Sequence, residues 1–173
     1  MSKSIKPVRR IVCVDDDGKS KAIADGPASD VRADPARPGY AATRIWVTDR
    51  TPARIDGVTE TLDMPHTLEP PAGGSVCRIV TFPPEAAWKN NVGAMGSPGA
   101  STYSTTAPHP YMQKTRTLDL CLVLEGEITL VLDTQEVHLQ AGDTVVQRGT
   151  NHAWSNRSGK PCTIAISMHD GRY

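Results

Sequence analysis

The sequence predicts an all-β fold in a single domain, and three observations support this prediction. A chain of 173 residues is most simply one domain. Glycine and proline each occur 14 times, so turns are frequent and long uninterrupted helices are not expected. From residue 115 onward, short aliphatic and β-branched runs follow one another, each ended by a turn signal. Such a succession is typical of an antiparallel sandwich or barrel.

The N-terminal half contains fewer strand signals, separated by polar connections. Strands are predicted near residues 10–15, 43–49 and 75–82. The first belongs to a hairpin, because its apolar run is followed by the turn pair Asp17-Gly18 and a second short strand. Connections are predicted at residues 31–39, 51–74 and 85–111, with a short helical turn at the start of the last.

The C-terminal half predicts six short strands, at residues 117–124, 128–133, 136–140, 143–147, 152–156 and 162–168. The first of them alternates Leu118, Leu120, Leu122 and Leu124 on one face with Asp119, Cys121 and Val123 on the other. A strand with two apolar faces needs cover on both sides. We therefore expect the leucines to pack on the N-terminal strands or on a second subunit. Because two-fold pairs are the commonest oligomers, a homodimer is predicted.

Composition limits the partners and the cellular location. The 19 basic and 19 acidic residues balance, so charge gives no reason to expect binding to nucleic acid or an anionic membrane. No apolar run is long enough to span a bilayer, and the N-terminus lacks the apolar core of a signal peptide. The four cysteines form no CxxC pair, which argues against a zinc knuckle and against disulfides. A soluble cytoplasmic protein with a small-molecule partner is expected.

Two stretches of the C-terminal half resemble the cupin superfamily. TLDLCLVLEGEITLVLD resembles the first cupin motif, and AGDTVVQRGTNHAWSN resembles the second, in the right order and separation. The resemblance implies an antiparallel double-stranded β-helix, the cupin or jelly-roll barrel, with extra N-terminal strands. It implies a cupin core at 108–173 and, at 1–107, an N-terminal β extension with long loops that wraps the barrel. That extension is similar to one in a bacterial and fungal subgroup of single-domain cupins.

The first motif usually reads His-x-His, three or four residues, Glu, six residues, Gly. Here Gly126 takes the glycine position and Asp119 stands where Glu is usual. The two histidine positions fall on Gln113 and Thr115. In the second motif His152 matches, but it is the only one of the usual three histidines that is present.

The resemblance also implies a metal site built from imidazoles and a carboxylate, which would hold Fe, Mn, Ni or Zn. With one matched imidazole the site is degenerate, and we expect a divalent metal to be weakly bound or absent. The candidate ligands are His152, Asp119, Gln113 and His109. His109 is included because it lies four residues before Gln113 and could supply a second imidazole.

A pocket inside the barrel is predicted around the same residues. Alternation places Asp119 with Cys121 on one strand face and His152 with Trp154 on another. A buried carboxylate needs a cation or hydrogen bonds, which favours a site role for Asp119. The other residues predicted for the pocket also fit purely structural roles. Gln113 and Thr115 equally fit surface positions at the start of the strand, while Cys121 and Trp154 fit ordinary core positions.

Two functions stay open at this point. The first is an enzyme acting on an organic acid or aromatic metabolite, of decarboxylase, isomerase or dioxygenase type. It would use a metal, or Asp119 and His152 as a catalytic acid–base pair. The second is a metal-free module that binds or senses a ligand through Gln113, Thr115, Cys121 and Trp154. In both readings residues 85–111 lie near the mouth of the pocket as a lid.

Overall fold

The computed structural model describes residues 6–90 and 107–173, and nearly all of their regular structure is β-strand. The strands are β1 (Arg9–Asp16), β2 (Lys19–Pro27), β3 (Val31–Ala33), β4 (Ala41–Thr48), β5 (Ser75–Phe82), β6 (Thr117–Glu125), β7 (Glu127–Leu132), β8 (Glu136–Gln140), β9 (Thr144–Arg148), β10 (His152–Ser155) and β11 (Cys162–Asp170). One 3-10 turn, η1 (Glu85–Ala87), follows β5. Within the two described ranges, no helix is long and apolar enough to cross a bilayer. The prediction of an all-β fold is confirmed.

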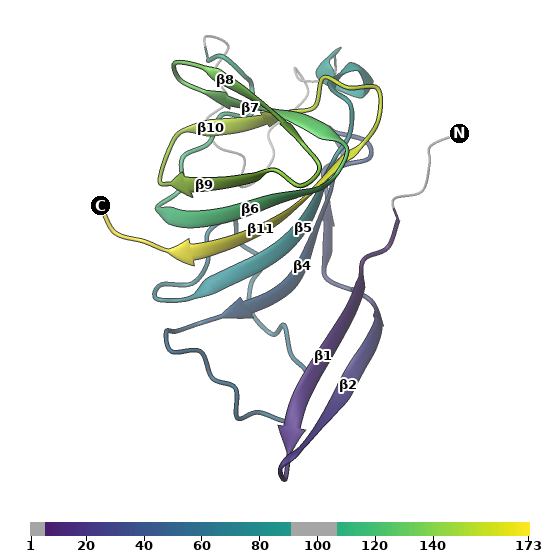
Figure 1. The fold of residues 1–173 in the computed structure, drawn as a ribbon, viewed down its shortest axis with the longest axis vertical. Helices are drawn as coiled ribbons and strands as arrows, with labels where there is room; N and C mark the ends of the chain where they lie inside the picture. Colours follow the sequence, from purple (N-terminus) through teal and green to yellow (C-terminus); the bar gives the residue numbers. More distant parts are fainter. Residues whose placement is uncertain (1–5, 91–106) are drawn as a thin grey trace.

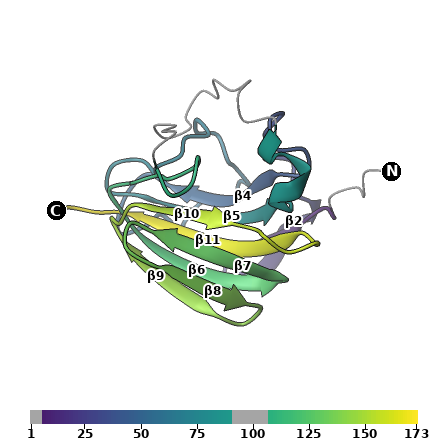
Figure 2. The same ribbon diagram turned by 90° about the horizontal axis from the view of Figure 1, so that it is seen from above.

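Two antiparallel sheets enclose the main core. The larger has six strands in the order β3-β4-β5-β11-β6-β9, and the smaller has three in the order β10-β7-β8 (Figures 1 and 2). The main core cluster takes residues from both, including Val80, Val123 and Ile164 from the larger sheet and Ile128, Leu130 and Leu139 from the smaller. This is the jelly-roll barrel that the resemblance implied.

The N-terminal strands join the barrel in two different ways. β4 and β5 continue the larger sheet directly, because β11 pairs with β5 along one edge and with β6 along the other. β1 and β2 instead form a separate hairpin that projects away from the barrel (Figure 1). Residues 31–33, predicted as part of a connection, form the edge strand β3 by pairing with Ala41–Thr43 of β4.

Two turns depend on left-handed backbone conformations. The β1–β2 hairpin turns at Asp17 (φ 53°) and Gly18 (φ 73°), as predicted from that residue pair. Gly126, the matched glycine of the first motif, links β6 to β7 with φ 81°. A Cβ atom there would lie 2.8 Å from the carbonyl oxygen of Pro161, so a larger residue would disturb the approach of β11.

The two faces of β6 differ sharply in exposure. Its inward residues Thr117, Asp119, Cys121 and Val123 are buried. Its outward leucines, Leu118, Leu120, Leu122 and Leu124, are 39–48% exposed. Of the two covers expected for these leucines, the N-terminal strands or a second subunit, the first is not found, because β4 and β5 lie beside β11 in the sheet and not over its outer face. Val146 of β9, opposite Leu120, extends the apolar surface and is 60% exposed.

We propose that a second copy of the chain covers this apolar face, since solvent exposure of adjoining leucines is unfavourable. Leu120→Lys should convert a dimer into a monomer at micromolar concentration in sedimentation velocity. Val137→Lys is the control, because Val137 is an exposed apolar residue on β8, outside the face. A wild-type protein that sediments only as a monomer would exclude this arrangement.

Asn156, the last residue of the stretch AGDTVVQRGTNHAWSN, holds the end of β5 to the turn before β11. Its side-chain amide donates to the carbonyl oxygens of Phe82 (2.9 Å) and Lys160 (2.8 Å). Its side-chain oxygen accepts from the backbone N–H (3.0 Å) and hydroxyl (2.8 Å) of Ser158. The residue is 1% exposed, so water cannot replace these bonds.

Asn156→Ala should therefore lower the free energy of unfolding by about 2–4 kcal/mol, because buried carbonyl groups would lose their donors. Urea unfolding followed by circular dichroism measures the loss. Asn151→Ala is the matched control, since the amide of Asn151 makes an exposed bond to Asp133. Equal stability of the two variants would contradict the structural role given to Asn156.

Candidate functional site

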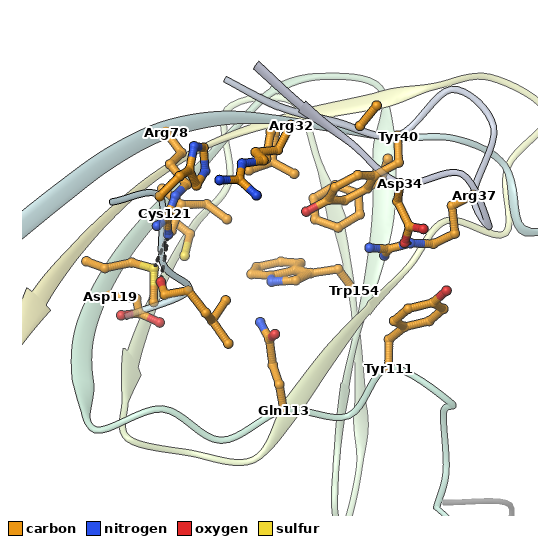
Figure 3. A pocket seen from close by; sticks show the side chains of 18 of the residues that line it. Arg32, Asp34, Arg37, Tyr40, Arg78, Tyr111, Gln113, Asp119, Cys121 and Trp154 are labelled. Atoms are coloured by element: carbon orange, nitrogen blue, oxygen red, sulfur yellow. Dashed lines mark hydrogen bonds and ion pairs between the residues drawn. The ribbon is translucent and has the colours of Figure 1, made fainter. Parts of the chain in front are cut away.

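A cavity of about 620 Å³ lies inside the barrel. Its lining comes from both halves of the chain: β4, β5 and the loops before them on one side, and β6, β10 and β11 on the other. In Figure 3, Gln113 and Trp154 extend into a space bordered by Asp119 and Arg78 and, farther along, by Tyr40, Arg37 and Tyr111. Five of the residues predicted for the pocket line it: Gln113, Asp119, Cys121, His152 and Trp154.

Asp119 is a buried carboxylate whose hydrogen-bond acceptors are not all satisfied. It occupies an inward position of β6, opposite Met168 of β11 and Gln147 of β9, and is 3% exposed. Its Oδ1 atom has no hydrogen-bond partner among the residues that the structure describes. Burial raises the pKa of Asp119, and this outweighs hydrogen bonding from Thr117 and the nearby charges of His152 and Arg78. The side chain is therefore predisposed to hold a proton.

His152 begins β10, and the described residues form a hydrogen bond with only one of its two ring nitrogens. Its Nδ1 atom lies 2.9 Å from the carbonyl oxygen of Thr150. A carbonyl only accepts hydrogen bonds, so Nδ1 carries the hydrogen and Nε2 carries the lone pair. Burial lowers the pKa of His152, although the bond to Thr150 and the charge of Asp119 oppose the shift. The ring is thus neutral near pH 7.

Gln113 is fixed beside His152 by the backbone. The N–H of Gln113 donates to the carbonyl oxygen of His152 (2.8 Å), and the N–H of His152 donates back to Gln113 (2.9 Å). This isolated bridge brings the start of the first motif to the second. Thr115 does not line the cavity: it is buried, and its hydroxyl lies 2.7 Å from that of Thr117.

His109 is held away from the cavity. Its Nδ1 atom accepts from the backbone N–H of Tyr111 (3.1 Å), so Nε2 carries the hydrogen and donates to Glu85 (3.0 Å). Both nitrogens are engaged, and the ring is not part of the lining. The predicted lid at 85–111 falls largely on residues 91–106, which lie outside the described residues.

Aromatic rings form a continuous wall of the cavity. His152 meets Trp154 edge to face with ring centroids 6.0 Å apart, Trp154 lies 6.3 Å from Phe82, and Phe82 lies 5.7 Å from Tyr40. The wall ends at Arg37, whose guanidinium lies 3.9 Å from the ring centroids of both Tyr40 and Tyr111. Such rings suit the flat apolar body of a small organic molecule.

Cys121 is a small apolar wall residue in this setting. Burial raises the pKa of its thiol to about 12, and the charge of Asp119 adds to the shift. The thiolate is the nucleophilic form of cysteine, so this thiol is chemically inert near neutral pH. Cys13, by contrast, is exposed on β1 of the hairpin.

The residues present do not fit a catalytic transition metal. Such a metal in a protein site is held by several imidazoles together with a carboxylate. The cavity offers the Nε2 atom of His152, the Asp119 carboxylate and the neutral amide of Gln113. A second imidazole of the lining, that of His66, is bound through Nδ1 to Asp30. No cluster of three or more His, Cys, Asp or Glu suited to a metal occurs within residues 6–90 and 107–173.

Several cavity residues were missed by the sequence analysis, and they lie in the N-terminal half: Arg37, Tyr40, Arg78 and Phe82. A signal existed for Arg78, which interrupts the apolar inward row of SVCRIVTF as Asp119 interrupts its own strand. Arg37 and Tyr40 come from an irregular loop, where periodicity carries no information.

Comparison with known proteins agrees with this fold. The family model described as "Cupin domain" matches residues 102–168. The chain is 34% identical over 127 residues to "Phomopsin biosynthesis cluster protein C'" of Diaporthe leptostromiformis, covering 69% of this chain and 66% of the relative. It is 32% identical over 119 residues to "Cupin-domain-containing oxidoreductase virC" of Hypocrea virens, covering 66% of this chain and 50% of the relative. The chain thus spans about half to two thirds of the length of these relatives.

Solved structures are similar at low sequence identity. The Cnp3 cupin domain of Schizosaccharomyces pombe is 6% identical with a TM-score of 0.48, and the match covers 94% of this chain and 87% of that one. A Cupin 2 conserved barrel domain protein of Salinispora arenicola is 13% identical with a TM-score of 0.43, covering 82% of each chain. From the barrel, the two motifs in order and the matches to the family model and the relatives, the chain belongs to the cupin superfamily.

Proposed function

We propose that this protein binds a small organic molecule in the barrel cavity and moves a proton on it with Asp119 and His152, without a metal. One observation carries the proposal. The unpartnered carboxylate oxygen of Asp119 and the ring of His152, with its free Nε2, line the same buried cavity. Such an arrangement leaves the Oδ1 atom of Asp119 and the Nε2 atom of His152 available to a ligand.

The environment of the pair suits proton transfer. Burial moves the two pKa values toward each other, because it raises that of Asp119 from 3.8 and lowers that of His152 from 6.5. Both shifts favour the uncharged form, in which a carboxyl group can donate a proton and an imidazole can accept one. Protonated Asp119 would donate and neutral His152 would accept, as isomerisation or decarboxylation of a carbonyl compound requires. Gln113, fixed beside His152, would orient a polar group of the ligand.

A metal-free binding module is the second candidate. It is favoured by the inert thiol of Cys121 and by the two imidazoles of the lining, because His66 is already bound to Asp30 and only His152 matches a histidine position of the cupin motifs. In that case Asp119 and His152 would bind a ligand without changing it. The name of the Hypocrea virens relative describes that protein as an oxidoreductase. An oxidation would need an electron acceptor in addition to the acid–base pair, so we do not extend it to this chain.

The two candidates differ in hydrogen exchange. A panel of small ketones and 2-oxo acids is incubated with wild type in D₂O. Wild type should catalyse the exchange of acidic C–H protons in at least one of these compounds, and proton NMR measures the exchange. His152→Ala and Asp119→Asn should each slow this exchange by about 10²–10⁴-fold, the usual contribution of general acid–base catalysis. His138→Ala is the control, because His138 lies exposed on β8.

The possible outcomes separate the candidates. Binding without exchange, weakened in both variants, would favour the binding module. If both variants fold and bind every ligand and metal that wild type binds, with equal affinity, the cavity assignment is wrong.

Asp119 should also lower stability near neutral pH. Because burial raises its pKa in the native state, the native protein holds this proton more tightly than the unfolded chain does. The contribution of Asp119 to stability is therefore most favourable below pH 3.8 and declines as the pH rises through the raised pKa. Asp119→Asn should increase the free energy of unfolding at pH 7, and the gain should shrink toward pH 4. Urea unfolding at both pH values measures this gain in the free energy of unfolding. If Asp119→Asn is less stable than wild type at pH 7, burial does not raise the pKa of Asp119.

A further inference from the structure

Arg78 is a buried cation in the wall of the cavity. It occupies an inward position of β5 between Val76 and Val80 and is 6% exposed. Its Nη1 atom donates to the carbonyl oxygen of Leu68 (2.9 Å) and lies 3.1 Å from the sulfur of Met168, while Nη2 donates to the carbonyl oxygen of Thr67. These bonds fix the guanidinium but leave its charge without a carboxylate partner in the described part of the chain.

Arg44 shows how this fold satisfies a buried arginine. Arg44 lies directly opposite Arg78 in the β4–β5 register and is 4% exposed. Its guanidinium pairs with Asp30 (2.5 Å) and also donates to the carbonyl oxygens of Leu62, Met64 and Pro65. The remaining oxygen of Asp30 is bound by His66 at 2.9 Å. The charges of Asp119 and Asp30 both act on Arg78, but Asp30 is bound by Arg44, and neither carboxylate forms an ion pair with Arg78 among the described residues.

Arg78 is placed to act on the same ligand as Asp119. Met168 connects them, since its sulfur contacts Arg78 and its backbone lies opposite Asp119 in the β11–β6 register. Figure 3 shows Arg78 and Asp119 bordering the same space. A guanidinium has five N–H donors, and three of the contacts above use them, so donors remain on a group that lines the cavity. The lining as a whole has three arginines and two aspartates.

We propose that Arg78 binds the carboxylate of the ligand, so that the cavity takes an aromatic or aliphatic carboxylic acid. This inference rests on the proposed function and names its substrate class. The carboxylate would supply the counter-charge that Arg78 lacks, through charge-assisted hydrogen bonds. The apolar body of the acid would lie along Trp154 and Phe82. The carbon next to the carboxylate would then lie near Asp119 and His152, where proton transfer at that carbon is possible.

Matched acid and amide probes test the inference. Three pairs serve: benzoate and benzamide, phenylacetate and phenylacetamide, and 3-phenylpropanoate and 3-phenylpropanamide, each titrated by calorimetry. Wild type should bind at least one acid about tenfold or more tightly than its neutral amide, as expected for hydrogen bonds between charged groups. Arg78→Met should reduce the affinity for the acid to that for the amide, with the affinity for the amide unchanged. Arg78→Lys, which keeps the charge, should retain part of the preference.

Arg148→Met is the control, since it removes an exposed arginine on β9 that does not line this cavity. Thermal unfolding of each variant reports folding. If Arg78→Met does not fold, the inference is tested by two other results: the preference of wild type for acids over amides, and the part of that preference that Arg78→Lys retains. Equal affinity of wild type for acids and amides overturns the role of Arg78 but leaves the proposed binding function standing. If no probe of any pair binds, both proposals fail. A preference for acids that survives in Arg78→Met also overturns the inference.

Discussion

The pairing of β11 with two neighbours determines the rest of this structure. β11 forms one antiparallel ladder with β5 from the N-terminal half and another with β6 from the cupin core. The two halves thereby become one continuous sheet, and their inward side chains face a shared interior. The cavity depends on this arrangement, because Arg78 and Phe82 come from β5 whereas Asp119 and Cys121 come from β6. A core formed by residues 108–173 alone would lack more than half of this lining.

The sequence was sufficient wherever a local pattern determines the outcome. The alternation around Asp119 predicted its burial beside Cys121, and the hairpin followed from Asp17-Gly18. It was insufficient wherever the outcome depends on contacts between distant segments. The two motifs placed Gln113 and His152 at one site, but no pattern indicates the backbone bridge between them, or that a loop delivers Tyr40 to the aromatic wall. The apolar outer face of β6 predicted that the leucines need cover. The residues of β4 and β5 do not indicate that these strands extend the sheet beside β11 instead of covering that face.

Buried charge is distributed unevenly in this barrel. Arg44 and Asp30 form a pair supplemented by backbone carbonyl groups, which is the usual condition for tolerating charge in an interior. Arg78 and Asp119 are both buried and less completely satisfied. Groups of this kind reduce stability, and proteins commonly carry them where a ligand completes their bonding. Arg78 and Asp119 border the cavity, whereas the Arg44–Asp30 pair is not part of its lining.

The positions of the cysteines determine how the protein responds to oxidants. Oxidation proceeds through the thiolate, and a thiol with a pKa of about 12 forms almost none at pH 7, so Cys121 is protected although it faces the cavity. Cys162 is fully buried, and burial raises its pKa to about 11. Cys13 on the projecting hairpin is exposed to solvent and to other molecules. Air-oxidised preparations will therefore cross-link first through Cys13, and a disulfide-linked species on a gel reports on the hairpin, not on the leucine face or the ligand cavity.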